Sequence, residues 1–129
     1  MKFESRIVDE WVKLWNVYDL NQVRELFLND MRVSYFSSEK KGLIKGFEAL
    51  IKHHADFGFV PGGKKQSNRL WLDDVGIEQF ENCVLVTAIW YFQRSGSERF
   101  QRGPVTLLYV KVDDDYKIAN ANFSNYLES

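Results

Sequence analysis

The chain of 129 residues is poor in the side chains that bind metals or form disulfide bonds. It has one cysteine and two histidines. A lone thiol, Cys83, cannot build a disulfide framework and offers no zinc-binding spacing. The histidines, His53 and His54, are neighbours, whereas a chelating pair on a helix is normally four residues apart. We therefore expect no metal and no cofactor.

An excess of one charge and long apolar runs are missing as well. The formal net charge is −1 at pH 7, and no basic block or stripe provides the clustered positive surface of a nucleic-acid-binding protein. No apolar run approaches membrane-spanning length, and no apolar signal segment is recognisable near the start. These absences predict no nucleic-acid partner, no membrane partner and a cytoplasmic location.

Aromatic residues, in contrast, make up 16% of the chain. Aromatic side chains fill cores, line apolar pockets and anchor interfaces. The excess is therefore consistent with a ligand cavity, with an oligomer interface, or with a core that is simply rich in rings.

Helical patterns precede strand patterns along the chain. Apolar residues recur at helical spacing over three segments, at about residues 5–18, 20–28 and 46–58. Alternating patterns predict five strands, at about residues 31–36, 66–75, 83–94, 104–112 and 116–126. No linker or internal repeat interrupts this order. It predicts one α+β domain over residues 1–129, with three N-terminal helices packed on a curved antiparallel sheet.

The closing hairpin, residues 106–124, has the most unusual pattern. Two apolar runs flank an Asp-rich turn, and the second run contains Asn120 and Asn122 at alternating positions. Strand alternation places both side chains on the face of Tyr116 and Ile118, which is expected to be buried. Polar groups on a buried face need hydrogen-bonding partners, either structural ones or a ligand.

Four segments, taken in order, resemble the nuclear transport factor 2-like superfamily, in its SnoaL-like and kinase association-domain-like bacterial branch. They are Trp15–Asn21, Leu26–Asp30, Gly46–Leu50 and the closing hairpin. The resemblance implies a cone-shaped half-barrel, often a homodimer through the outer sheet face, with a pocket between sheet and helices. Such relatives include isomerases, dehydratases, cyclases and epoxide hydrolases, but also ligand-binding and assembly proteins, so the fold does not decide the function.

The chain departs from the pattern of this family in the closing hairpin. Leu107 stands where the association-domain branch often has Arg, and Asn120 and Asn122 stand at two positions where the family has His. Asn forms hydrogen bonds but transfers no proton near neutral pH. The resemblance therefore implies a pocket end without its usual ionisable groups, which argues against acid–base chemistry from the sheet.

His54 is the one near-neutral titrating group that we expect on an inward face, because it falls on the apolar stripe of the third helix. A hydrogen-bonded core histidine is the alternative for this residue. Trp90 and Tyr109 belong either to the cavity or to the core. The predicted pocket residues are Tyr35, His54, Trp90, Tyr109, Asn120 and Asn122, of which His54 is the candidate catalyst.

Three functions remain open at this point. The first is a homodimeric pocket protein that binds a small, largely apolar molecule. The second is a homo-oligomeric assembly domain with a vestigial pocket. The third is an isomerase-like or dehydratase-like enzyme in which His54 transfers the proton. A small or collapsed cavity would favour the assembly domain over the other two.

Overall fold

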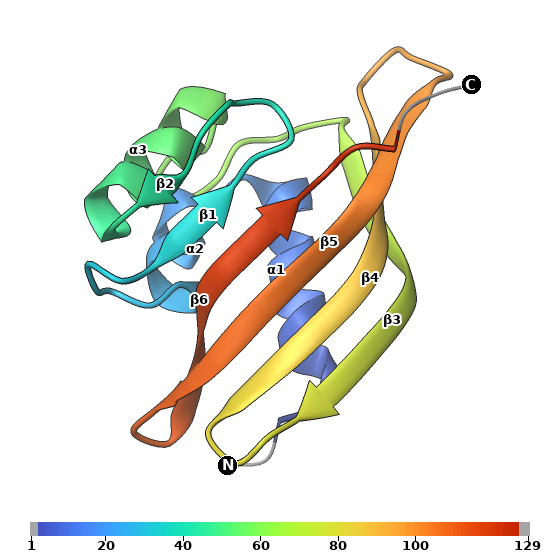
Figure 1. Ribbon diagram of the computed structural model, residues 1–129. Coiled ribbons are helices and arrows are strands. Elements are labelled where there is room, and N and C mark those ends of the chain that lie inside the picture. Colours follow the sequence, from blue (N-terminus) through green and yellow to red (C-terminus); the bar gives the residue numbers. More distant parts are fainter. Residues whose placement is uncertain (1–2, 127–129) are drawn as a thin grey trace.

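The computed structural model describes residues 3–126 and has a layer of helices on one face of a twisted sheet (Figure 1). The helices are α1 (Ser5–Val17), α2 (Leu20–Leu26) and α3 (Phe47–Phe57). The strands are β1 (Ser34–Phe36), β2 (Ile44–Lys45), β3 (Arg69–Gln79), β4 (Cys83–Gln93), β5 (Phe100–Val112) and β6 (Asp115–Phe123). This is the predicted α+β architecture of three helices packed on a curved sheet.

The sheet is mixed, however, and not antiparallel throughout. Its strand order is β2-β1-β6-β5-β4-β3, and β3 to β6 form the predicted antiparallel meander. Strand β1 runs parallel to β6, with Ser34 opposite Asn120. Most of the chain separates these two strands, so no tight hairpin imposes an antiparallel direction on them. The two-residue strand β2 is too short to give an alternating pattern in the sequence.

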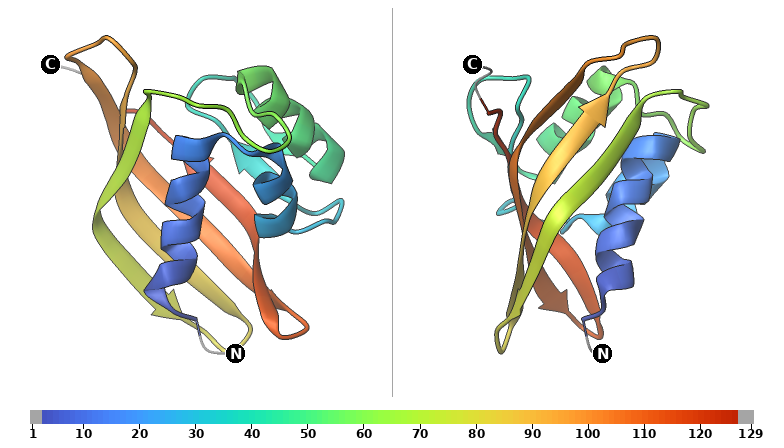
Figure 2. Two further views of the ribbon diagram at one scale, coloured as in Figure 1. Left: turned by 180° about the vertical axis from the view of Figure 1, so that it is seen from behind. Right: turned by 90° about the vertical axis from the view of Figure 1, so that its right-hand side faces the viewer.

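Helix α1 lies across the concave inner face of the sheet (Figure 2). One apolar stripe of this helix is buried, at the predicted helical spacing: Ile7, Val8, Trp11, Leu14 and Trp15. Tyr18, with a left-handed φ of 60°, ends the helix. Asp19 then caps α2, and its carboxylate accepts hydrogen bonds from the backbone N–H groups of Asn21 at 3.0 Å and Gly62 at 2.9 Å.

The segment after β6 crosses β5 at Gly103. The backbone N–H of Ser124 donates to the Pro104 carbonyl at 3.1 Å, and that of Tyr126 donates to the Arg102 carbonyl at 3.0 Å. A Cβ atom on Gly103 would lie only 2.7 Å from the Ser124 carbonyl carbon. Such a close approach of two backbones requires glycine, and it places the Ser124 carbonyl over the inner face of the sheet.

Candidate functional site

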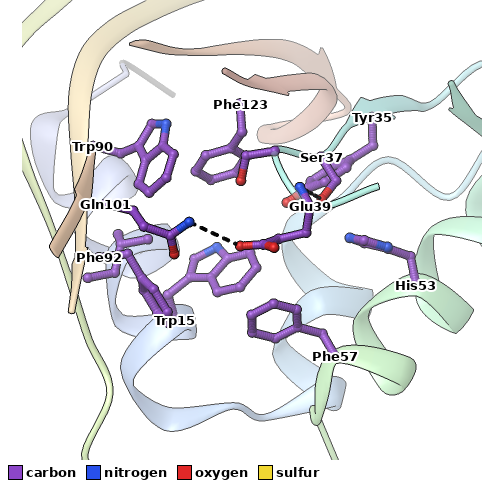
Figure 3. A pocket seen from close by; sticks show the side chains of 12 residues that line it. Trp15, Tyr35, Ser37, Glu39, His53, Phe57, Trp90, Phe92, Gln101 and Phe123 are labelled. Carbon is purple, nitrogen blue, oxygen red and sulfur yellow. Dashed lines mark hydrogen bonds between the residues drawn. The ribbon is translucent and has the colours of Figure 1, made fainter. Parts of the chain in front are cut away.

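A pocket lies between the inner face of the sheet and helices α1 and α3 (Figure 3). Its free space is about 30 Å³, which is room for roughly one or two water molecules. Side chains from both helices, from five strands and from the loop after β1 line it. They are Trp15, Tyr35, Ser37, Ser38, Glu39, His53, Phe57, Leu70, Trp90, Phe92, Gln101 and Phe123.

Six aromatic rings form most of the walls, because the apolar stripes of α1 and α3 face inward positions of the sheet. The ring of Trp15 packs edge-on against Phe57, with 5.3 Å between ring centroids, and against Phe123, with 5.9 Å. Trp90 packs against Phe123 at 5.5 Å. The indole N–H of Trp90 donates to the Ser124 carbonyl at 2.9 Å. Mutual packing and this hydrogen bond therefore fix the walls.

The indole nitrogen of Trp15 is buried and has no hydrogen-bond partner among residues 3–126. In Figure 3 it lies on the edge of the ring that faces Gln101 and Glu39. A buried N–H without an acceptor costs about 1–3 kcal/mol. One residue of the pocket wall therefore keeps an unused hydrogen-bond donor just beneath the cavity surface, and an acceptor atom that reached it would remove this cost.

Glu39 lies at the mouth of the pocket, on the loop of residues 37–43, and its side chain points inward (Figure 3). Its carboxylate accepts from the Arg94 guanidinium at 3.2 Å and from the Gln101 amide at 3.5 Å. Both charged side chains are about half exposed, and such pairs contribute at most about 1 kcal/mol. The Asn125 amide also donates to the Ser38 carbonyl at 3.1 Å. Weak contacts thus hold the loop over the pocket.

His53 of α3 also lines the pocket, with its ring 5.3 Å from that of Tyr35. Burial lowers the pKa of His53 below its usual value of 6.5, and the nearby charge of Lys40 lowers it further. The imidazole is therefore neutral at pH 7 and offers one donor and one acceptor nitrogen. Its neighbour on the helix behaves differently.

His54 is fully buried behind the pocket wall and does not line the cavity. Its Nδ1 lies 2.8 Å from the Leu50 carbonyl. A carbonyl can only accept, so Nδ1 carries the proton and Nε2 is a bare acceptor. Burial lowers the pKa of His54 to about 4. The ring is neutral at pH 7 and packs edge-on against Phe59 at 5.1 Å and Tyr35 at 5.3 Å. These are the properties of a core histidine.

The prediction that Asn120 and Asn122 lie on the buried face is wrong. Ile118 is opposite Tyr109, but Asn120 is opposite the preceding residue of β5, Leu108, so Ala119 is an extra residue in β6. A bulge of this kind reverses which face the later side chains occupy. Asn122 is accordingly exposed. The Asn120 amide donates to the Ser34 hydroxyl at 2.8 Å, a structural partner away from the pocket.

Two other predicted residues, Tyr35 and Trp90, do line the pocket. Tyr109 is buried elsewhere, with its ring 4.9 Å from Phe3. The other ten lining residues, among them Trp15, Glu39, His53 and Gln101, are not among the predicted ones. The sequence does indicate that Trp15 is buried, because this residue falls on the apolar stripe of α1. No such indication exists for Glu39, because it belongs to a polar turn whose position depends on the folded chain.

The fold is that of the nuclear transport factor 2-like superfamily, and solved structures of that superfamily match nearly the whole chain. An NTF2-like protein of unknown function from Pseudomonas putida has a TM-score of 0.82 at 12% identity, covering 95% of this chain and 84% of its own. A candidate dehydratase of the NTF2-like family from Streptomyces avermitilis has a TM-score of 0.80 at 14% identity, covering 96% of this chain and 94% of its own.

A candidate ketosteroid isomerase from Parabacteroides distasonis has a TM-score of 0.76 at 17% identity, covering 97% of this chain and 89% of its own. No protein-family model matches the chain, and no curated protein is significantly similar in sequence. At such low identities the likeness establishes the fold and leaves the chemistry to be argued from the pocket.

Within the described part of the chain, no three His, Cys, Asp or Glu side chains come together as a metal site would require. None of the helices in residues 3–126 has the length and apolarity needed to cross a membrane. The candidate functional site is the aromatic pocket with Glu39 at its mouth.

Proposed function

We propose that the protein is a homodimeric pocket protein that binds a small, largely apolar molecule between its sheet and helices. The observation that carries this proposal is a cavity walled by six aromatic rings, one of which, Trp15, has a buried indole N–H without a partner. Apolar walls with a few placed polar groups are typical of small-molecule sites. A ligand would bury its apolar body against the rings and direct one acceptor atom to Trp15.

Ligand entry on this proposal requires the loop of residues 37–43 to move, because ligand pockets usually measure about 300–1,000 Å³ and the free space is about 30 Å³. The contacts that hold this loop are few and exposed. The Glu39–Arg94 ion pair and the Asn125–Ser38 hydrogen bond join partners that water can replace. Opening the loop therefore has a small energetic cost compared with disrupting the core.

The indole N–H resonances report directly on this proposal. Titration with cyclohexanone, a neutral apolar ring with one acceptor oxygen, should shift the Trp15 resonance saturably and leave that of Trp71, on the outer sheet face, in place. Trp15→Phe keeps an aromatic ring but removes the donor, and should weaken binding by about threefold to tenfold, as measured on the Trp90 indole of the same pocket. Trp71→Phe is the matched control. Equal shifts of both indoles, or no saturable shift, would contradict a pocket ligand.

The homodimer is supported by the outer face of the sheet. Three aromatic rings from adjacent strands cluster there. Trp71 and Tyr91 stack at 5.4 Å with an interplanar angle of 5°, and Phe100 lies 5.7 Å from Tyr91. Phe100 is 46% exposed. The strand register continues this surface with three further apolar side chains, namely Leu85, Ile89 and Leu108. A twofold axis could place this surface against its copy.

Sedimentation velocity should accordingly give a dimer. Trp71→Glu should raise its dissociation constant by at least about thirtyfold, because aromatic residues at interface centres often contribute about 2 kcal/mol or more. Phe80→Ser, at an exposed position in the β3–β4 turn, is the control and should leave the dimer intact. A monomeric wild-type protein would refute the dimer.

An assembly domain with a vestigial pocket is the second candidate, and the small free volume of the pocket favours it. That function predicts an oligomer larger than a dimer and no saturable response of Trp15 to cyclohexanone. The third candidate, proton transfer by His54, has less support, because this side chain lies outside the pocket lining and its pKa of about 4 leaves it neutral at pH 7.

A further inference from the structure

The lining of the pocket carries one negative charge at neutral pH, and a cation from outside the lining, Arg94, pairs with it. Among the described side chains that line the pocket, Glu39 is the one with a full charge, because His53 is neutral at pH 7. The remaining lining groups are aromatic, aliphatic, hydroxyl or amide groups. A carboxylate at the mouth of an aromatic pocket attracts cations directly, and the negative faces of aromatic rings attract them as well. An anionic ligand in the cavity would be repelled by Glu39, although Arg94 beside it offsets part of that repulsion.

A cation of the protein itself already occupies part of this environment. The guanidinium of Arg94 lies 5.4 Å from the ring centroid of Phe92, one of the pocket walls, and 3.2 Å from the Glu39 carboxylate. Arg94 does not line the cavity itself, and its side chain is about half exposed. The Phe92 ring and the Glu39 carboxylate together therefore bind one positive group, the Arg94 guanidinium, in the folded protein.

We infer that the ligand of this pocket is a small organic cation, an alkylated ammonium compound with one acceptor oxygen. The inference rests on the proposed ligand-binding function. The ammonium group would take the place of the Arg94 guanidinium beside Glu39 and pack its alkyl groups against the aromatic walls. The oxygen would accept the buried N–H of Trp15. Such a ligand satisfies the two polar features of the pocket at once.

Three isosteric probes separate charge from shape. Choline, 3,3-dimethylbutan-1-ol and 3,3-dimethylbutanoate carry a positive, zero and negative charge on nearly the same skeleton, and each has an oxygen for Trp15. The neutral alcohol is the most easily desolvated of the three, so a preference for choline can come only from charge. We expect choline to bind about tenfold more tightly than the alcohol, with the butanoate weakest, as measured by the Trp15 indole shift.

Variants test whether Glu39 causes the preference for choline over the neutral alcohol. Glu39→Gln also frees the loop and so changes the affinity of every ligand, but the ratio of choline affinity to alcohol affinity should fall to about one. Arg94→Gln removes the competing cation and should strengthen choline binding. Glu48→Gln, at an exposed position of α3, is the control and should change neither affinity. Raising the salt concentration should weaken choline binding and leave alcohol binding unchanged.

The outcomes distinguish the two proposals. Alcohol binding that equals or exceeds choline binding, or a preference for the butanoate, overturns the cation inference while the pocket still binds ligands. Failure of all three probes, together with cyclohexanone, to shift the Trp15 resonance overturns the pocket function itself. An equal loss of choline affinity in Glu39→Gln and Glu48→Gln would also refute the role of Glu39, since a general charge effect would then explain it.

Discussion

Gly103→Ala is expected to lower the free energy of unfolding by about 3 kcal/mol or more. The added methyl carbon would lie 2.7 Å from the Ser124 carbonyl carbon and 2.9 Å from the Asn125 Cα. Both atoms belong to backbone, and hydrogen bonds from Ser124 and Tyr126 to β5 hold that backbone in place. Relief of the clash must therefore break these bonds or bend the strand. Urea denaturation measures the loss.

The matched control is Gly76→Ala on β3. Gly76, like Gly103, is a strand glycine whose φ is not positive, so neither substitution forces a left-handed alanine. The methyl group added at position 76 would lie 3.0 Å from the Thr87 hydroxyl, which can rotate away. We expect a loss of less than about 1 kcal/mol there. Similar losses in both variants would show that the crossing at Gly103 is not a tight constraint.

Acidification is expected to destabilise the protein between about pH 6.5 and pH 4 through His54. The unfolded chain takes up a proton on this residue near pH 6.5, whereas the folded protein does so only near pH 4. Within that window the unfolded state binds more protons, so stability falls as the pH falls. The total loss reaches about 3 kcal/mol at the lower end, since each unit of pKa difference corresponds to about 1.4 kcal/mol.

His54→Leu should remove most of this dependence, because leucine fills a similar volume and does not titrate. Unfolding free energies of the variant at pH 7 and pH 4.5 should differ by much less than those of the wild type. The pKa of His53 is lowered too, so His53→Gln is the control, and it should keep most of the slope. An unchanged slope in His54→Leu would contradict the assignment, whatever the absolute stability of the variant.

The helices could be predicted closely because their signals are local. The apolar stripe of α1 and the glycines that flank α3 set the boundaries of these elements in the sequence itself. The predicted second helix extends two residues too far, because Phe27 is extended and forms a bridge with Ile118 of β6. That bridge joins residues far apart in the chain, and no local pattern indicates it.

The site was harder to predict for two physical reasons. Alternation along β6 holds only until Ala119. This unpaired residue moves both Asn120 and Asn122 from the inner face of the sheet to the outer face. A bulge is a property of a strand and its partner together, and the sequence of one strand does not contain it. Glu39, likewise, is an ordinary turn residue until the loop meets Gln101 and Arg94.

The contact of the Ser124 carbonyl with Trp90 has a consequence for the order of events during synthesis. One wall of the pocket depends on a hydrogen bond to residue 124, and β1 pairs with β6, whose residues are made some 86 positions later. The three helices leave the ribosome before β3 to β6, but the cavity cannot be completed until β6 has emerged. The walls made early, Trp15, Tyr35 and Phe57, therefore lack their partners from β6 while the intervening strands are synthesised, and apolar surface exposed in such an interval favours aggregation.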